Sequence, residues 1–203
     1  MNILFVGDIF GKPGRRVLRD NIANLRERLE ADMVIVNGEN AAGGFGLTEE
    51  MGEEILGKAD VITSGNHIWD KKETQPYIGR QRRLLRPHNY PATTPGRGWY
   101  VYETAGGHAV GVLNLMGRVF MDPTDCPFQA ADRVLAEKPA HVNTVFVDMH
   151  AETTSEKWAM GWYLAGRVSA VVGTHTHVPT ADERILKDHT GFISDVGMTG
   201  TFD

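Results

Sequence analysis

The chain has 203 residues, a net charge of −5 and 41% hydrophobic residues, which is ordinary for a soluble globular protein. No apolar run approaches the roughly 20 residues of a membrane-spanning helix, and the N-terminus lacks the basic region and long apolar core of a secretory signal. The single cysteine, Cys126, excludes an internal disulfide framework. We therefore expect a single domain over residues 1–203, in the cytoplasm and without membrane contact.

The first third of the chain alternates between predicted strands and helices. Short apolar runs predict three buried strands, at residues 2–6, 33–37 and 60–65. A helical spacing of apolar residues begins at Pro13 and ends at Leu29, and Thr48 begins a second predicted helix that runs to about residue 58. This order of strands and helices predicts a parallel sheet with right-handed crossovers.

The rest of the chain adds a hairpin and further alternation. Two β-rich runs within residues 99–115 flank the sequence AGGH and predict an antiparallel hairpin, and residues 118–128 predict an irregular insertion. Later patterns predict helices at 128–138 and 155–166 and strands at 143–150 and 168–177. The chain ends soon after one more predicted strand, so we expect the C-terminal part of the fold to be incomplete.

Polar side chains follow five of the predicted strands. Ligands bind beyond the carboxyl ends of strands in open α/β sheets, so these side chains are expected to meet at one rim. They are Asp8, Glu39, Asn40, Asn66, His67, His150, His175 and His177. Each alone has an ordinary explanation as a cap, a turn residue or a structural histidine. The pair His175 and His177 lies in a predicted extended segment, where alternate residues point to the same side. Because such polar side chains follow five separate strands, a metal site is favoured over these ordinary explanations.

A phosphate-binding P-loop is excluded for the first of these exits. The segment GDIFGK (7–12) has the glycines and the lysine of such a loop. A P-loop, however, needs four residues between its glycines and a Ser or Thr after the lysine. Here three residues separate Gly7 from Gly11, and Pro13 follows Lys12.

The order of the polar motifs resembles that of the calcineurin-like metallophosphoesterases. The matching elements are GDIF (7–10), GEN (38–40), GNH (65–67), His150 and GTHTH (173–177). Phe10 stands where that family has a histidine, and Glu39 with Asn40 replaces its second aspartate motif. The strings NGENAAGG, GNHIWDKKE, HAETTSEK, VVGTHTHVPTAD and DVGMTG further resemble the bacterial YmdB-type branch, whose members are linked to 2′,3′-cyclic nucleotide phosphodiesterase activity.

This resemblance implies a layered α/β/β/α sandwich with mixed sheets and two metal ions per chain. Glu39 is implied as the carboxylate that bridges the ions, and the amide oxygen of Asn40 as the replacement for the histidine missing at Phe10. The implied ligand sets are Asp8, Glu39, Asn40 and His177 for one ion, and Glu39, Asn66, His150 and His175 for the other. Imidazole and oxygen ligands without thiolates favour iron or manganese, with zinc as a further candidate.

The resemblance also implies a reaction. We expect hydrolysis of a phosphodiester, such as a 2′,3′-cyclic nucleotide, by a hydroxide that bridges the ions. His67, which is left out of the ligand sets, is expected to protonate the leaving oxygen, with an ordinary turn histidine as the alternative. Asp70 is expected either to orient His67 or to cap a helix that starts near Lys71. Phe45 and Trp69 are candidates for stacking a base.

Two other function classes remain open. A metal-dependent amidohydrolase also begins its site with His-x-His, although such proteins usually carry the pair after an early strand. A regulatory protein could keep the metal site for nucleotide or RNA binding, but no long basic groove is visible, so RNA is not indicated. A homo-oligomer is equally open. The helical spacing of Trp158, Trp162 and Tyr163 predicts that all three lie in the core rather than in a base-stacking surface.

Overall fold

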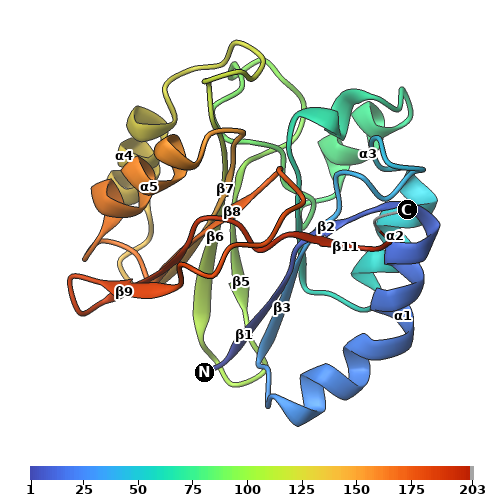
Figure 1. Ribbon diagram of the computed structural model, residues 1–203, viewed down its shortest axis with the longest axis horizontal. Helices are drawn as coiled ribbons and strands as arrows, with labels where there is room; N and C mark the ends of the chain where they lie inside the picture. The colour runs from blue at the N-terminus through green and yellow to red at the C-terminus, as the bar shows by residue number, and fades with distance from the viewer. Residues whose placement is uncertain (202–203) are drawn as a thin grey trace.

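The structure is a computed structural model that describes residues 1–201 (Figure 1). The helices are α1 (Gly11–Arg28), α2 (Glu49–Leu56), the 3₁₀ helix η1 (Asn66–Trp69), α3 (Thr74–Arg80), α4 (Pro127–Glu137) and α5 (Thr154–Leu164). The strands are β1 (Ile3–Val6), β2 (Asp8–Ile9), β3 (Met33–Asn37), β4 (Val61–Thr63), β5 (Trp99–Glu103), β6 (Ala109–Met116), β7 (Thr144–His150), β8 (Ala170–Thr174), β9 (Arg184–Leu186), β10 (Thr190–Ile193) and β11 (Met198–Thr199). No helix within residues 1–201 combines the length and the apolar character needed to cross a membrane.

Two sheets lie face to face at the centre of the molecule. One is parallel, with strand order β1-β3-β4, and the other is mixed, with strand order β5-β6-β7-β8-β10-β9. Helices α1 and α2 cover the outer face of the first sheet, and α4 and α5 cover the outer face of the second (Figure 1). The predicted α/β/β/α sandwich with mixed sheets is therefore confirmed.

Strand β3 shows why the buried strands are continuous apolar runs. Met33 and Ile35 pack between the two sheets, in one cluster with Phe146 of β7. Val34 and Val36 point the other way and join the cluster that includes α1 and α2. Because successive side chains alternate across a strand, burial on both faces requires an apolar residue at each position. Each such side chain contributes roughly 1.5–3 kcal/mol of transfer free energy.

Most predicted elements are present with shifted ends. The hairpin is confirmed by antiparallel pairing of β5 with β6, where Trp99 lies opposite Leu113. Thr48 caps α2 as predicted, since its Oγ1 accepts a hydrogen bond of 3.2 Å from the Met51 amide. The helix expected near Lys71 is present as α3, which begins at Thr74. The sequence patterns missed β9 and the short strands β2 and β11, which pair in parallel with Met198 opposite Asp8.

The prediction that Trp162 and Tyr163 lie in the core was wrong. They are 51% and 41% exposed on α5, whereas Trp158 is partly buried against the core. Adjacent residues of a helix point in different directions, so the three side chains cannot all share one buried face. The buried face of α5 is formed instead by small and aliphatic residues such as Met160, Gly161 and Leu164.

Candidate metal centre

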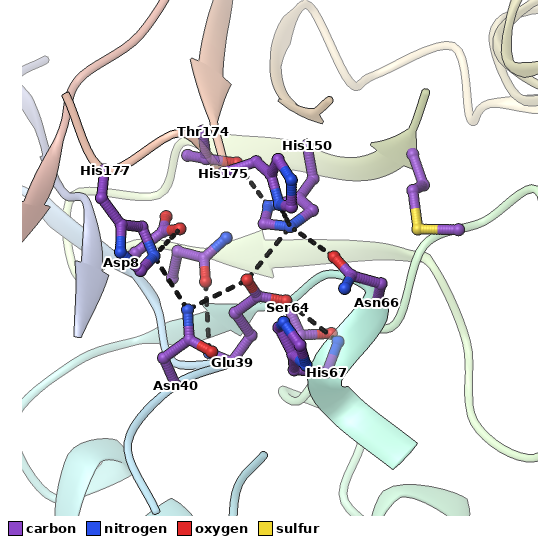
Figure 2. A network of polar contacts seen from close by, with 12 residues as sticks. Asp8, Glu39, Asn40, Ser64, Asn66, His67, His150, Thr174, His175 and His177 are labelled. Carbon is purple, nitrogen blue, oxygen red and sulfur yellow. Dashed lines mark hydrogen bonds and ion pairs between the residues drawn. The ribbon is translucent and has the colours of Figure 1, made fainter. Parts of the chain in front are cut away.

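The predicted site residues meet at one rim of the sandwich, beyond the carboxyl ends of strands from both sheets (Figure 2). Asp8 lies on β2, and His150 is the last residue of β7. The others lie in the segments that follow β3, β4 and β8, which are Glu39, Asn40, Asn66, His67, His175 and His177. The rim therefore collects carboxylate, amide and imidazole groups from five separate segments, as the strand-exit argument predicts.

Glu39 lies at the centre of this cluster. Its ligand atoms belong to two groups, one with His150 and His175 and one with Asp8 and His177, and the atoms within each group lie within 4.8 Å of one another. The Glu39 side chain is buried, its Oε1 lies 3.1 Å from His150 Nε2, and Oε1 also accepts a 3.1 Å hydrogen bond from Asn40 Nδ2. A single carboxylate is thus shared by two groups of potential ligands.

The surroundings of His150 Nε2 show that hydrogen bonds alone leave the cluster unsatisfied. Besides Glu39 Oε1, this nitrogen lies 3.2 Å from Asn66 Oδ1 and 3.0 Å from His175 Nδ1 (Figure 2). One imidazole nitrogen carries at most one hydrogen, so at most one of the three neighbours can accept from it. The neighbouring atoms that receive no hydrogen from Nε2 direct their lone pairs toward one another. A cation bound between them would accept these lone pairs.

The second group contains buried oxygen atoms that lack hydrogen bonds. Within residues 1–201, neither Asp8 carboxylate oxygen nor Asn40 Oδ1 has a hydrogen-bond partner, and Asp8 is fully buried. Asp8 Oδ2 lies 3.4 Å from His177 Nε2, an ion-pair distance, but the two atoms form no hydrogen bond. Burying such groups without partners is costly, so the Asp8 oxygens fit the ligand role that the resemblance implies. The Asn40 amide, in contrast, turns Nδ2 rather than Oδ1 toward Glu39 and His177, at 3.1 and 3.0 Å.

The electrostatics of the cluster favour a positive charge at its centre. Burial raises the pKa of Asp8, whereas for Glu39 the nearby histidines, His150 foremost, outweigh burial and lower the pKa. Burial opposes a charge on His150, yet Glu39, Asp8 and Asp148 raise its pKa to about 9. Burial and the proximity of His150 lower the pKa of His175 to about 4, so this imidazole is neutral at neutral pH.

The extended backbone expected at His175 and His177 was wrong. Strand β8 ends at Thr174, and the two histidines have φ values of 103° and 67°, in the left-handed region that side chains rarely adopt. This bent backbone sends His175 Nδ1 to the group with His150 and His177 Nε2 to the group with Asp8. The pair therefore divides between the two groups because of a bend, which the sequence pattern did not indicate.

A buried network behind His150 was missed at the sequence level. His150 Nδ1 lies 2.9 Å from Thr174 Oγ1, which donates to Asp148 Oδ1 over 2.7 Å. Asp148 Oδ2 accepts hydrogen bonds from Thr63 and Asn37, and burial raises the Asp148 pKa to about 6. The contact with Thr174 occupies Nδ1 of His150, so Nε2 is the ring nitrogen that faces the metal centre. A carboxylate two positions before His150 in an apolar strand was the available signal, because both lie on one face.

Glu152 is a second residue that sequence reasoning missed. Its Oε2 lies 3.1 Å from His175 Nε2, the ring nitrogen opposite the one that faces His150. A carboxylate on the outer nitrogen of a ligating histidine fixes its tautomer and its orientation. The half-exposed Glu152 follows β7 in the string HAETTSEK, which offered no spacing from which its role could be predicted.

His67 lies at the edge of the cluster and is held from two sides. Its Nδ1 lies 2.8 Å from Asp70 Oδ2, and its backbone amide donates to Glu39 Oε2 over 3.3 Å. The alternative that Asp70 caps a helix near Lys71 was wrong, since α3 begins at Thr74 with Glu73 at its N-cap. The geometry favours the orienting role for Asp70.

Aromatic rings border the cluster at two places. The Phe45 ring packs edge-on against His67 at a centroid distance of 5.0 Å and is 55% exposed. Trp69 is partly buried and packs edge-on against Tyr90, so it presents less free surface. The Phe10 ring packs edge-on against His177 at 5.5 Å and therefore supports this histidine by packing.

Comparisons with known proteins agree with this geometry. The chain is 50% identical over 204 residues to the 2′,3′-cyclic-nucleotide 2′-phosphodiesterase of Bacillus subtilis (strain 168), covering all of this chain and 77% of the relative. A hypothetical protein from Thermus thermophilus has a crystal structure that matches with a TM-score of 0.93 and 45% identity, over 100% of this chain and 78% of that one.

A crystal structure described as a novel phosphatase, from Mycoplasma pneumoniae, matches with a TM-score of 0.89 and 36% identity, over 97% of this chain and 71% of that one. The family model described as YmdB-like protein matches residues 4–203, which is almost the whole sequence. The sequence match, the layered fold and the shared carboxylate at the rim agree with one another, and the chain belongs to the YmdB-like protein family.

Proposed function

We propose that this chain is a dinuclear metal-dependent phosphodiesterase that hydrolyses 2′,3′-cyclic nucleotides in the cytoplasm. The observation that carries the proposal is Glu39, a single buried carboxylate shared by two groups of potential metal ligands. Two-metal sites of this kind are typical of enzymes that hydrolyse phosphate esters. The name of the Bacillus subtilis relative supports the choice of substrate.

The proposed ligand sets follow the two groups. Asp8, Asn40 and His177 would hold one ion with Glu39, while Asn66, His150 and His175 would hold the other with Glu39. The donors are oxygen and imidazole nitrogen without thiolate, which suits iron or manganese and admits zinc. Only two of the ligands are anionic, so two divalent ions would make the centre positive and attractive to a phosphodiester anion, although the whole chain carries −5.

The side chains around the ions would divide the remaining work. When bound, a pair of such ions supplies an activated water nucleophile and neutralises charge on the phosphoryl oxygens. His67 would hold the proton for the departing oxygen on Nε2, because Asp70 engages Nδ1. Asp70 would keep the imidazole ring in place. The exposed face of Phe45, which borders His67, would support the base of the nucleotide.

The proposal is tested with purified protein and a panel of 2′,3′- and 3′,5′-cyclic nucleotides, with manganese or iron added. We expect hydrolysis of the 2′,3′-cyclic substrates and loss of that activity in a chelator. The expected product is the nucleoside 3′-phosphate, since the relative's name places the broken bond at the 2′ oxygen. Nucleotide binding without turnover would favour a regulatory binding protein, and cleavage of amides instead of phosphodiesters would favour an amidohydrolase.

Substitution of His67 by alanine separates proton donation from metal binding. We expect kcat for a 2′,3′-cyclic nucleotide to fall about 10²–10⁴-fold, because a ribose alkoxide leaves poorly without a proton. The loss should be much smaller with bis-p-nitrophenyl phosphate, whose leaving group is a weak base. Metal content, measured by elemental analysis, should not change. His108→Ala, at an exposed histidine of the β5–β6 hairpin, is the matched control. Equal losses on both substrates would contradict the role as acid.

A further inference from the structure

A buried ion pair lies behind the segment that carries His175 and His177. Lys157 of α5 donates a 2.6 Å hydrogen bond to Asp195, which follows β10, and the two side chains are 1% and 3% exposed. Placing two charges in the interior is costly, and apolar replacements of such pairs often leave a protein as stable or more stable. Stability alone is therefore a weak explanation for this pair.

Asp195 connects the ion pair to the histidine segment. Its Oδ2 accepts hydrogen bonds from both the backbone amide and the Oγ1 of Thr176, at 3.3 and 2.8 Å. Thr176 is the residue between the two histidines, so one carboxylate oxygen binds Lys157 and the middle of the segment together.

The backbone at this point needs such support. His175 and His177 both have φ in the left-handed region, which persists for residues with a side chain only where the surroundings over-determine it. The hydrogen bonds from Thr176 to Asp195 hold the residue between the two strained positions. Close packing holds the base of the segment, since a Cβ at Gly173 would lie 1.8 Å from the Ser194 carbonyl oxygen.

The other oxygen of Asp195 reaches toward Asp8. Asp195 Oδ1 accepts a 2.8 Å hydrogen bond from the Gly197 amide, immediately before β11. Strand β11 pairs with β2, where Met198 lies opposite Asp8. Gly7 lies directly against this segment, because a Cβ there would come within 2.2 Å of the Gly197 carbonyl oxygen. Asp195 therefore links the segments that carry three of the proposed ligands, without touching the ligand atoms.

We propose that the Lys157–Asp195 pair fixes the positions of His175, His177 and Asp8. These positions in turn determine the affinity of the metal centre for its ions. The proposal rests on the proposed function, because it assumes that these three side chains hold cations. Neither Lys157 nor Asp195 is a ligand or a catalytic residue. Residues that hydrogen-bond to metal ligands typically change the metal affinity about 10–100-fold when they are removed, and we expect an effect of this order for Asp195, which holds the backbone that carries the ligands.

The test compares Asp195→Asn with Asp60→Asn, a matched control. Asp60 is also buried, accepts hydrogen bonds from Arg26 and from the Val34 amide, and precedes β4 at the end of the sheet away from the rim. Both variants should unfold at a lower temperature than the wild type. At a temperature where circular dichroism shows both folded, titration of the metal-free protein with Mn²⁺ should give a dissociation constant raised about 10–100-fold in Asp195→Asn alone.

Thr176→Val provides a second variant that keeps the ion pair and removes the hydrogen bonds of Thr176 Oγ1 to Asp195 and to the backbone of Val178. It should weaken Mn²⁺ binding by up to about tenfold, the low end of the effect of such supporting partners, because the ion pair and the bond from the Thr176 amide remain, and it decides the question if Asp195→Asn does not fold. The proposal is overturned if the wild type binds Mn²⁺ and neither variant binds it more weakly, or if Asp60→Asn weakens binding as much as Asp195→Asn. A wild type that binds no divalent ion would overturn the proposed function and this inference together.

Discussion

Replacement of Glu39 by alanine is expected to leave a protein that binds fewer than two metal ions and hydrolyses phosphodiesters about 10³-fold more slowly, or worse. The reason is geometric, because Glu39 is the one carboxylate shared by the two ligand groups. Its removal also takes away the hydrogen-bond acceptor of Asn40 and the oxygen beside His150 Nε2. Elemental analysis of the folded fraction and kcat with a 2′,3′-cyclic nucleotide measure the two effects.

Glu53→Ala is the control for this substitution. Glu53 lies on α2 and accepts hydrogen bonds from Tyr77 and Gln81, away from the rim. Its loss should lower stability somewhat and leave metal content and turnover unchanged. If Glu39→Ala retained two ions per chain and the wild-type rate, the shared-carboxylate model of the centre would be wrong.

Replacement of Gly65 by alanine is expected to disrupt the centre by adding a single methyl group. The new Cβ would lie 2.1 Å from His150 Nε2 and 2.3 Å from Glu39 Oε2, so both side chains must move. The backbone of Gly65, with φ −146° and ψ −144°, is not in the left-handed region, so the expected damage comes from contact. Overpacking of this kind costs about 1–3 kcal/mol of stability, and the displaced ligands should lose metal as well.

Gly79→Ala makes the same chemical change where space is free. Apart from the chain neighbours and the backbone of α3 itself, no described atom lies within 4 Å of a Cβ at Gly79. Because alanine favours a helix over glycine, this variant should gain up to about 1 kcal/mol of stability with wild-type metal content. Thermal unfolding and metal analysis on the two variants check the contrast. Normal metal content in Gly65→Ala would show that the rim tolerates a wider spacing than the structure has.

Local patterns were sufficient for most of the fold. Strand β3 from Met33 to Val36 and strand β7 from Val145 to Val147 are apolar runs because both faces of each sheet are covered. Thr48 marks the start of α2 because its hydroxyl caps the first turn. Patterns failed where the elements are very short. Strand β2 has two residues and exists only because β11, from the far end of the chain, pairs with it.

At the rim, too, local sequence patterns predicted some features, whereas others depend on contacts between distant segments. The polar residues after successive strands predicted a meeting of Asp8, Glu39, His150 and the two late histidines, and the structure brings these residues together. The bend at His175 and the links from Asp195 and Asp148 were not predicted, since each depends on contacts between segments far apart in sequence. A buried carboxylate in a strand is visible in the sequence, but its partners are not.

The sequence by itself determined which side chains stand at the strand ends, because the period of a strand and the handedness of its crossovers are local properties that put all carboxyl ends on one edge. Strand patterns did not divide those side chains into two groups around Glu39; the family resemblance implied the division, and only the tertiary structure supplies the geometry that produces it. That division depends on how closely the two sheets pack and on the left-handed backbone at His175 and His177, which contacts with Asp195 hold in place.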